Sequence, residues 1–106
     1  MTGVYYTPGK FGLETVGEAD DGGGYDFDKF VVWRNQRGEY LWAQDQGCSC
    51  PTPFEDYSLE NLPIGTAADA LNDLRVWVKE DYEWGSRATA AAPLIETLEA
   101  LAHAPH

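Results

Sequence analysis

The sequence predicts a single α+β domain over residues 1–106, in which a small antiparallel sheet of about three strands, with a central hairpin, is packed by two C-terminal helices. Segments rich in aromatic and β-branched residues, typical of strands, lie between about residues 11 and 45. Segments with apolar residues at helical spacing follow at about 67–84 and 90–103. Strands followed by helices indicate an α+β fold. A chain of 106 residues can bury one hydrophobic core but not two.

The first expected strand is FGLETVGEA, residues 11–19. Side chains alternate between the two faces of a strand, so Leu13, Thr15 and Gly17 should share one face. The acidic stretch DDGGG, residues 20–24, follows as a connection, because a strand interior does not tolerate three glycines well.

The central hairpin is predicted from YDFDKFVVWRN and GEYLWAQD, with residues 35–38 between them. A type I turn with Gly38 in the left-handed region would close it. Both strands carry apolar residues on both faces, so the sheet needs cover on both sides. The expected faces are Phe27, Val31 and Trp33 against Phe30 and Val32 on the first strand, and Tyr40 and Trp42 against Leu41 and Ala43 on the second.

Two helices cover one face of such a sheet. We therefore expect the other face to be partly covered by the 47–65 loop and to keep an apolar contact surface. This surface would bind a protein partner or a second copy of the chain, giving a homo-oligomer. The alternative is that Phe54 and Tyr57 fold the loop fully over the tryptophans. The candidate contact residues are Trp33, Tyr40, Trp42 and Phe54.

The loop begins with GCSCPTPFEDY, residues 47–57, which is the most unusual stretch of the chain. A disulfide between Cys48 and Cys50 would be strained, and the usual redox spacing is Cys-x-x-Cys. The interpretation we favour is a structural loop, in which Gly47 makes a turn and both thiols pack as small hydrophobic groups. Pro51 and Pro53 would stiffen that loop.

A zinc site is the remaining alternative for these cysteines. A structural zinc ion needs four ligands, and this chain has two cysteines and two histidines. The spacing between these residues is unusual for zinc, so we expect neither a metal nor another cofactor. The weak candidate ligands are Cys48, Cys50, His103 and His106.

The first predicted helix spans about 67–84. Thr66 can cap it, with Asp69 as the acid of a capping box, and Gly85 ends it. The second helix, about 90–103, should be capped by Ser86 or Thr89 and should carry Pro93 in its first turn.

The acids of the first helix form a stripe opposite its apolar face. They are Asp69, Asp73, Glu80 and Glu83. An ordinary solvated helix face is one interpretation. A docking surface for a basic partner, or a mimic of the phosphate row of DNA, is the other.

The overall charge limits the class of partner. The chain has 18 acids and 7 bases, for a formal net charge of −11. Such a surface repels phosphates, so we expect no direct nucleic-acid binding and no binding to anionic lipid. No apolar run approaches the roughly 20 residues of a membrane span, and the N-terminus lacks the pattern of a secretory signal. No histidine or nucleophile adjoins a carboxylate pair, so we expect no enzymatic activity.

One stretch resembles a known family. The run WAQDQGCSCPTPFEDY, residues 42–57, is similar to the hallmark W-A-x-D-x-G-C-S-C-P-x-P-F-E-D-Y of small actinobacteriophage proteins that share a domain of unknown function. TPGKFGLETVGE, residues 7–18, also resembles the opening of that family. The resemblance covers about residues 5–62 and implies a phage origin and a location in the host cytoplasm, but no mechanism.

These observations favour a non-enzymatic bacteriophage accessory protein that binds a host or phage protein, such as a host factor that it inhibits. The alternatives are an acidic DNA mimic, a minor virion or assembly protein, and a small zinc-binding module. The strongly acidic chain would attract a basic partner surface. Such a partner fits both the favoured interpretation and the acidic DNA mimic.

Overall fold

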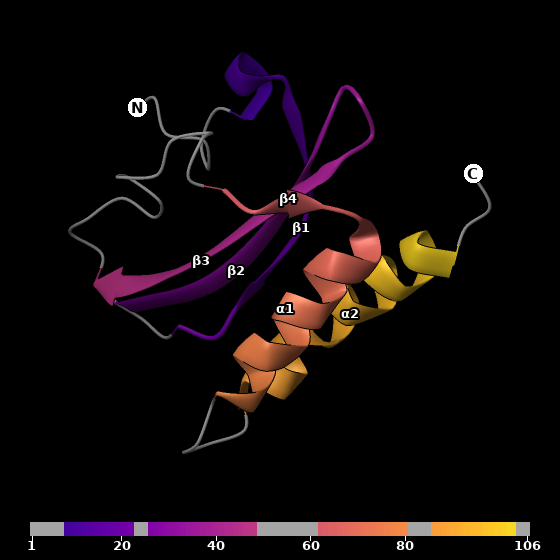
Figure 1. Ribbon diagram of the computed structural model, residues 1–106. Coiled ribbons are helices and arrows are strands. Elements are labelled where there is room, and N and C mark those ends of the chain that lie inside the picture. The colour runs from indigo at the N-terminus through magenta and orange to yellow at the C-terminus, as the bar shows by residue number, and fades with distance from the viewer. Residues whose placement is uncertain (1–7, 23–25, 49–61, 81–85, 104–106) are drawn as a thin grey trace.

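A computed structural model describes residues 8–22, 26–48, 62–80 and 86–103. It has two layers, an antiparallel sheet and a helix pair that packs on one face of the sheet (Figure 1). The predicted α+β class is confirmed, and the sheet has four strands in the order β1-β2-β3-β4 where about three were expected. The elements are the 3₁₀ helix η1 (Pro8–Phe11), β1 (Leu13–Asp20), β2 (Asp26–Asn35), β3 (Tyr40–Cys48), β4 (Ile64–Gly65), α1 (Ala67–Lys79) and α2 (Ser86–His103).

The β2–β3 hairpin closes as predicted. Gly38 has a φ of +82°, and its N–H donates to the carbonyl of Asn35 at 3.1 Å. The Asn35 side-chain oxygen also accepts from the backbone N–H groups of Arg37 and Glu39, each at 2.9 Å. Asparagine side chains bond to nearby backbone in this way in many turns. The turn fixes the register in which Val32 lies opposite Trp42.

Both faces of the hairpin are buried, as the mixed apolar pattern predicts. On the face under the helices, β2 and β3 contribute Phe30, Val32, Tyr40 and Trp42 to one core cluster. On the opposite face, Val31, Trp33, Leu41 and Ala43 form a second cluster with Leu13 and Leu62, against which Phe11 packs.

The simple alternation predicted for the first strand is wrong. A register shift lies between Thr15, which pairs with Trp33, and Gly17, which pairs with Val32. The extra residue of such a bulge moves the following side chains to the other face. Gly17 therefore faces α2, and a Cβ at this position would lie 2.9 Å from Leu94 Cδ1. The glycine allows the second helix to pack closely on β1.

The first helix begins as predicted and ends earlier. The Thr66 hydroxyl accepts from the Asp69 N–H at 3.1 Å, and the Asp69 carboxylate accepts from the Thr66 N–H at 3.0 Å, which completes the capping box. The helix ends at Lys79, with Glu80 as its C-cap, and not near residue 84. Residues 81–85, including the expected stop at Gly85, lie outside the described residues.

The second helix begins at Ser86, before the expected start near residue 90. Pro93 consequently lies in the helix interior and not in its first turn. The alanine-rich run before the proline explains the early start, because alanine has the highest helix propensity. The exposed ring of Pro93 costs the helix one backbone hydrogen bond, while Ala91 and Leu94 on either side remain buried in the core.

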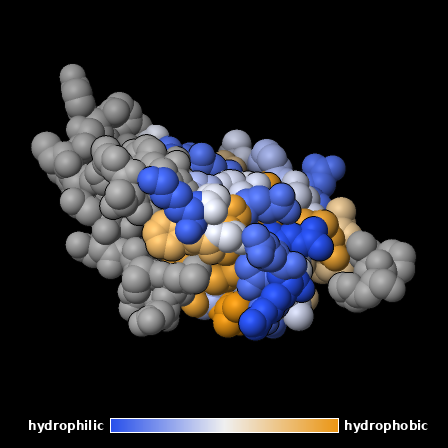
Figure 2. Space-filling model, turned by 90° about the horizontal axis from the view of Figure 1, so that it is seen from above, coloured by the Kyte–Doolittle hydropathy of each residue, from blue (hydrophilic) through white to orange (hydrophobic). Residues whose placement is uncertain are grey.

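The surface around this core is mixed in character. In the view from above, hydrophilic residues interrupt the apolar ones (Figure 2). Among the described residues, the large hydrophobic side chains that are well exposed are Ile64, at 54%, and Val76, at 48%. They lie on different elements, β4 and α1, and so offer two separate positions at which an apolar contact can be tested.

Candidate functional site

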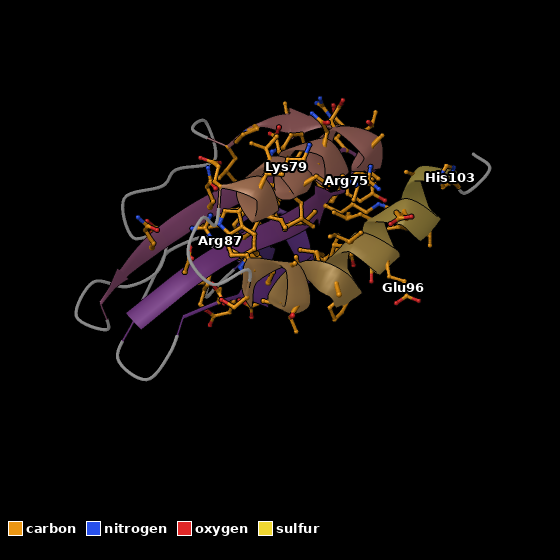
Figure 3. All side chains as sticks on the ribbon, turned by 90° about the horizontal axis from the view of Figure 1, so that it is seen from below. Arg75, Lys79, Arg87, Glu96 and His103 are labelled. Carbon is orange, nitrogen blue, oxygen red and sulfur yellow. The ribbon has the colours of Figure 1, made fainter. Side chains whose placement is uncertain are left out.

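A groove lies between β3 and α1. It consists of two neighbouring hollows of about 380 and 510 Å³, and Gln44 and Glu80 line both. The far ends of β2 and β3 extend beyond the helix pair, which Figures 1 and 3 show from two directions. We call this groove the β3–α1 groove. Small-ligand and peptide pockets fall in the same size range, about 300–1,000 Å³.

The wall of the groove is one stripe of α1. Asp73, Val76, Trp77 and Glu80 line it, at the spacing of residues that share a helix face. The floor is the helix-facing side of the sheet, with Asp28 and Phe30 of β2 and Trp42, Gln44 and Gln46 of β3, and with Pro63 and Arg87 at the ends. Ala43 and Asp45 also line the groove, but they alternate with these residues along β3 and belong to the opposite face.

One end of the groove is mainly apolar. Phe30, Trp42, Pro63 and the half-exposed Val76 meet there. The Trp42 indole N–H donates to the Asp73 carboxylate at 2.6 Å, so this acid of the wall is fixed by a residue of the floor. An exposed apolar side chain beside a fixed carboxylate suits a partner that combines an apolar group with a positive charge.

The other end is polar and is organised by Arg87. Its guanidinium donates to both oxygens of Asp28, at 2.9 and 3.1 Å, and to the carbonyl of Trp77 at 2.8 Å. It also lies over the Trp77 ring, 4.5 Å from the centroid. These contacts tie the start of α2 to the end of α1 and to β2 (Figure 3). Bidentate and aromatic contacts of this kind suit arginine and not lysine.

The charge of the groove is negative. Its described lining residues on the helix-facing side carry the carboxylates of Asp28, Asp73 and Glu80 and the single guanidinium of Arg87. That guanidinium is already engaged by Asp28. An anionic ligand would therefore meet repulsion here, whereas a cationic one would be attracted.

The predicted acidic stripe is partly confirmed. Asp69, Asp73 and Glu80 are exposed, as expected. Asp73 and Glu80 line the groove, while Asp69 serves the helix cap, and both aspartates have a structural hydrogen bond. Glu83 lies outside the described residues.

The expected aromatic contact surface is not exposed. Trp33 is fully buried, and Tyr40 and Trp42 are 8% and 5% exposed. The second face is covered more completely than expected, since Leu62 belongs to the cluster that contains Trp33 and Phe11 packs against it. The expectation that these three side chains form an open surface is therefore wrong. Phe54 lies outside the described residues.

The described cysteine and histidine do not come together. Cys48 ends β3 and His103 ends α2, and these ends lie at opposite sides of the molecule in Figures 1 and 3. Zinc ligands lie within about 2.3 Å of the metal, so a single site that contains both residues is excluded. Within the described ranges, no group of three or more histidine, cysteine or acidic residues could hold a metal ion.

The start of the predicted structural loop is strand instead. Gly47 and Cys48 belong to β3, where they pair with Phe27 and Asp26. The strand is longer than expected because its pairing with β2 continues to Asp26, the first residue of β2. Other members of that loop lie outside the described residues: Cys50, Pro51 and Pro53. His106 does too.

The polar end of the groove was not predicted from the sequence. Asp28 and Arg87 are 59 positions apart and have no shared motif. One signal was present: Arg87 lies in the first turn of a helix, where the helix dipole disfavours a positive charge. Such a residue in a strongly acidic chain indicates a specific carboxylate partner.

A second charged cluster lies on the opposite face of the sheet. The Lys29 ammonium contacts Asp20 at 2.9 Å and Glu18 at 3.1 Å. Burial raises the pKa of Asp20, but hydrogen bonds from the Gly22 N–H, the Lys29 ammonium and the Asp28 N–H outweigh it, so this pKa is below its usual value. Glu18, Asp20 and Lys29 do not line the groove, so we assign this cluster to stability.

Within the described part of the chain, no helix is both long and apolar enough to cross a membrane.

Comparisons with known proteins give one finding, a match to a family model. Searches of curated proteins and of solved structures each found no significant match. A family model described as "Domain of unknown function (DUF7574)" matches residues 2–104, which is nearly the whole chain. This protein therefore belongs to that family of domains of unknown function.

Proposed function

We propose that this protein is a non-enzymatic accessory protein of a bacteriophage, which acts in the host cytoplasm by binding a basic host or phage protein through the β3–α1 groove. The observation that carries the proposal is the groove itself, in which an exposed apolar residue, Val76, lies between the carboxylates of Asp73 and Glu80. Charge complementarity of this kind speeds association and selects partners.

The phage origin rests on the sequence. The run at residues 42–57 resembles the hallmark of small actinobacteriophage proteins, and that resemblance supports expression inside a bacterial host. Many accessory proteins of this size act by binding, and inhibition of a host factor is the consequence that we expect of the binding.

A matched pair of substitutions tests the groove. Val76→Arg introduces a bulky charge into the groove, whereas Ile64→Arg makes the same type of change at an exposed position on β4 that does not line the groove. Both side chains are about half exposed, so both variants should fold, with stability within about 0.5 kcal/mol of wild type. Affinity capture from a host lysate should retain a partner with the wild type and with Ile64→Arg, and should lose it with Val76→Arg.

The captured partner then separates the alternatives. A partner that binds equally to the wild type and to Val76→Arg would contradict the groove as the binding site. A DNA-binding partner that duplex DNA displaces would identify the DNA mimic. If the wild type instead self-associates in sedimentation experiments and Val76→Arg is monomeric, the partner is a second copy of the chain.

A further inference from the structure

We infer that the partner segment in the β3–α1 groove presents an apolar side chain next to a lysine or arginine, and that the positive charge binds at Glu80. This inference rests on the proposed function and specifies the chemistry of the partner. Each part of it follows from a different feature of the groove.

The apolar requirement follows from the smaller part of the groove. Its volume of about 380 Å³ lies between Val76 on the wall and Trp42 and Phe30 on the floor. Val76 is 48% exposed, so a partner side chain that covers it removes apolar surface from water. The size of the hollow suits one or two side chains of a peptide and not a folded surface.

The positive charge follows from the position of Glu80. This residue lines both parts of the groove, so a segment that lies along the groove passes it. Asp73 and Asp28 already have partners in Trp42 and Arg87. Glu80 is exposed, and a cation bound there would not displace either contact.

The helix dipole adds to this preference. Glu80 is the C-cap of α1, and the C-terminal end of a helix carries a partial negative charge. Arg87 already uses this end, since it donates to the carbonyl of Trp77. The carboxylate of Glu80 and the last carbonyls of α1 therefore both attract a bound cation.

The spacing between the apolar and the basic side chain of the partner follows from the positions of Val76 and Glu80. The apolar hollow lies beside Val76, and Glu80 follows one helical turn later at the junction with the polar part. A partner with its apolar and basic side chains adjacent, or two residues apart on an extended strand, can reach both places.

A peptide library tests the inference with the purified full-length protein. A display library of random seven-residue peptides is selected on the immobilised wild type, and enriched peptides are measured by fluorescence anisotropy. We expect enrichment of lysine or arginine beside leucine, isoleucine, methionine or phenylalanine. Binding to Glu80→Gln should be about three- to tenfold weaker, as for the loss of one charge-assisted contact.

The matched control is Glu96→Gln, which makes the same change of charge on the exposed face of α2, away from the groove (Figure 3). It should leave affinity within about twofold, because exposed charges at that distance are screened. Equal weakening by both variants, or enrichment of acidic or uncharged peptides, would overturn the inference.

Failure of the inferred partner chemistry can be distinguished from failure of the proposed function. If Val76→Arg abolishes capture of the partner but the selected peptides lack a basic residue, the groove is the binding site and the inferred chemistry is wrong. A library that yields no peptide sensitive to Val76→Arg also overturns the inference. Amide chemical-shift changes on titration with a selected peptide should be centred on Gln44, Val76 and Glu80.

Discussion

Two neighbouring residues of β2 anchor ionic contacts on opposite faces of the sheet. Asp28 points to the helix-covered face, where Arg87 holds it with two hydrogen bonds. Lys29 points to the other face, where it contacts Glu18 and Asp20 on the edge strand β1. The sequence places a charge of each sign side by side, and the alternation of the strand sends the two charges into different environments.

The two cations are similarly buried, but their partners are not. The side chains of Arg87 and Lys29 are 14% and 12% exposed. Asp28 is 21% exposed, whereas Glu18 and Asp20 are 41% and 39% exposed. Water therefore competes more strongly for the carboxylates of the Lys29 cluster. Burial of both partners, and not of the cation alone, decides how much an ion pair contributes to stability.

The largest expected effect is the loss of Arg87. Arg87→Met leaves Asp28 and the Trp77 carbonyl without this donor on a partly buried face, and should lower the free energy of unfolding by about 2–4 kcal/mol. Arg87→Lys keeps the charge but not the bidentate geometry, and should fall between Met and wild type. Urea unfolding provides the measurement.

Arg75→Met is the control for this prediction. Arg75 is 54% exposed and contacts Glu99 at 3.6 Å, so its loss should cost less than about 0.5 kcal/mol. If Arg87→Met costs no more than Arg75→Met, the contrast between covered and open ion pairs does not hold in this protein.

A smaller effect is expected at the Lys29 cluster, whose carboxylates are more exposed. Lys29→Met should lower the free energy of unfolding by about 0.5–1 kcal/mol, because the partner carboxylates remain solvated. The loss should shrink in about 1 M salt, where the screening length falls to about 3 Å. A salt-independent loss of the same size as that of Arg87→Met would contradict the contrast between the two ion clusters.

The parts of the fold that depend on neighbouring residues could be predicted from the sequence. The Asn35–Gly38 turn, the Thr66–Asp69 capping box and the two apolar faces of the hairpin all follow local rules of spacing and residue type. The turn and the capping box form through contacts within a few residues, and the two faces of the hairpin follow from the alternation of side chains along each strand.

The parts that depend on distant residues could not be predicted. The bulge at Val16 is set by how β1 fits against β2 and α2, and Gly17 has no local feature that distinguishes it from a turn glycine. To predict the groove, one would likewise need to know where α1 ends relative to β3. The sequence identified Asp73 and Glu80 as an acidic stripe, but not the strand that faces them.

The smallest expected effect is the pH dependence of the Lys29 cluster. Hydrogen bonds and the Lys29 charge lower the pKa of Asp20 in the folded state below its ordinary value of 3.8, although burial acts in the opposite direction. The unfolded chain therefore binds this proton first as the pH falls, so the stabilising contribution is complete above the unfolded pKa and is lost as the pH falls through the folded pKa. Asp20→Asn should remove this part of the acid dependence and leave a shallower decrease in stability below about pH 4. The Glu18→Gln variant is the control, because it removes a second Lys29 partner while Asp20 keeps its backbone donors Gly22 and Asp28. NMR titration of the Asp20 carboxyl carbon gives the folded pKa directly, and a midpoint above 3.8 would contradict the assigned hydrogen bonds.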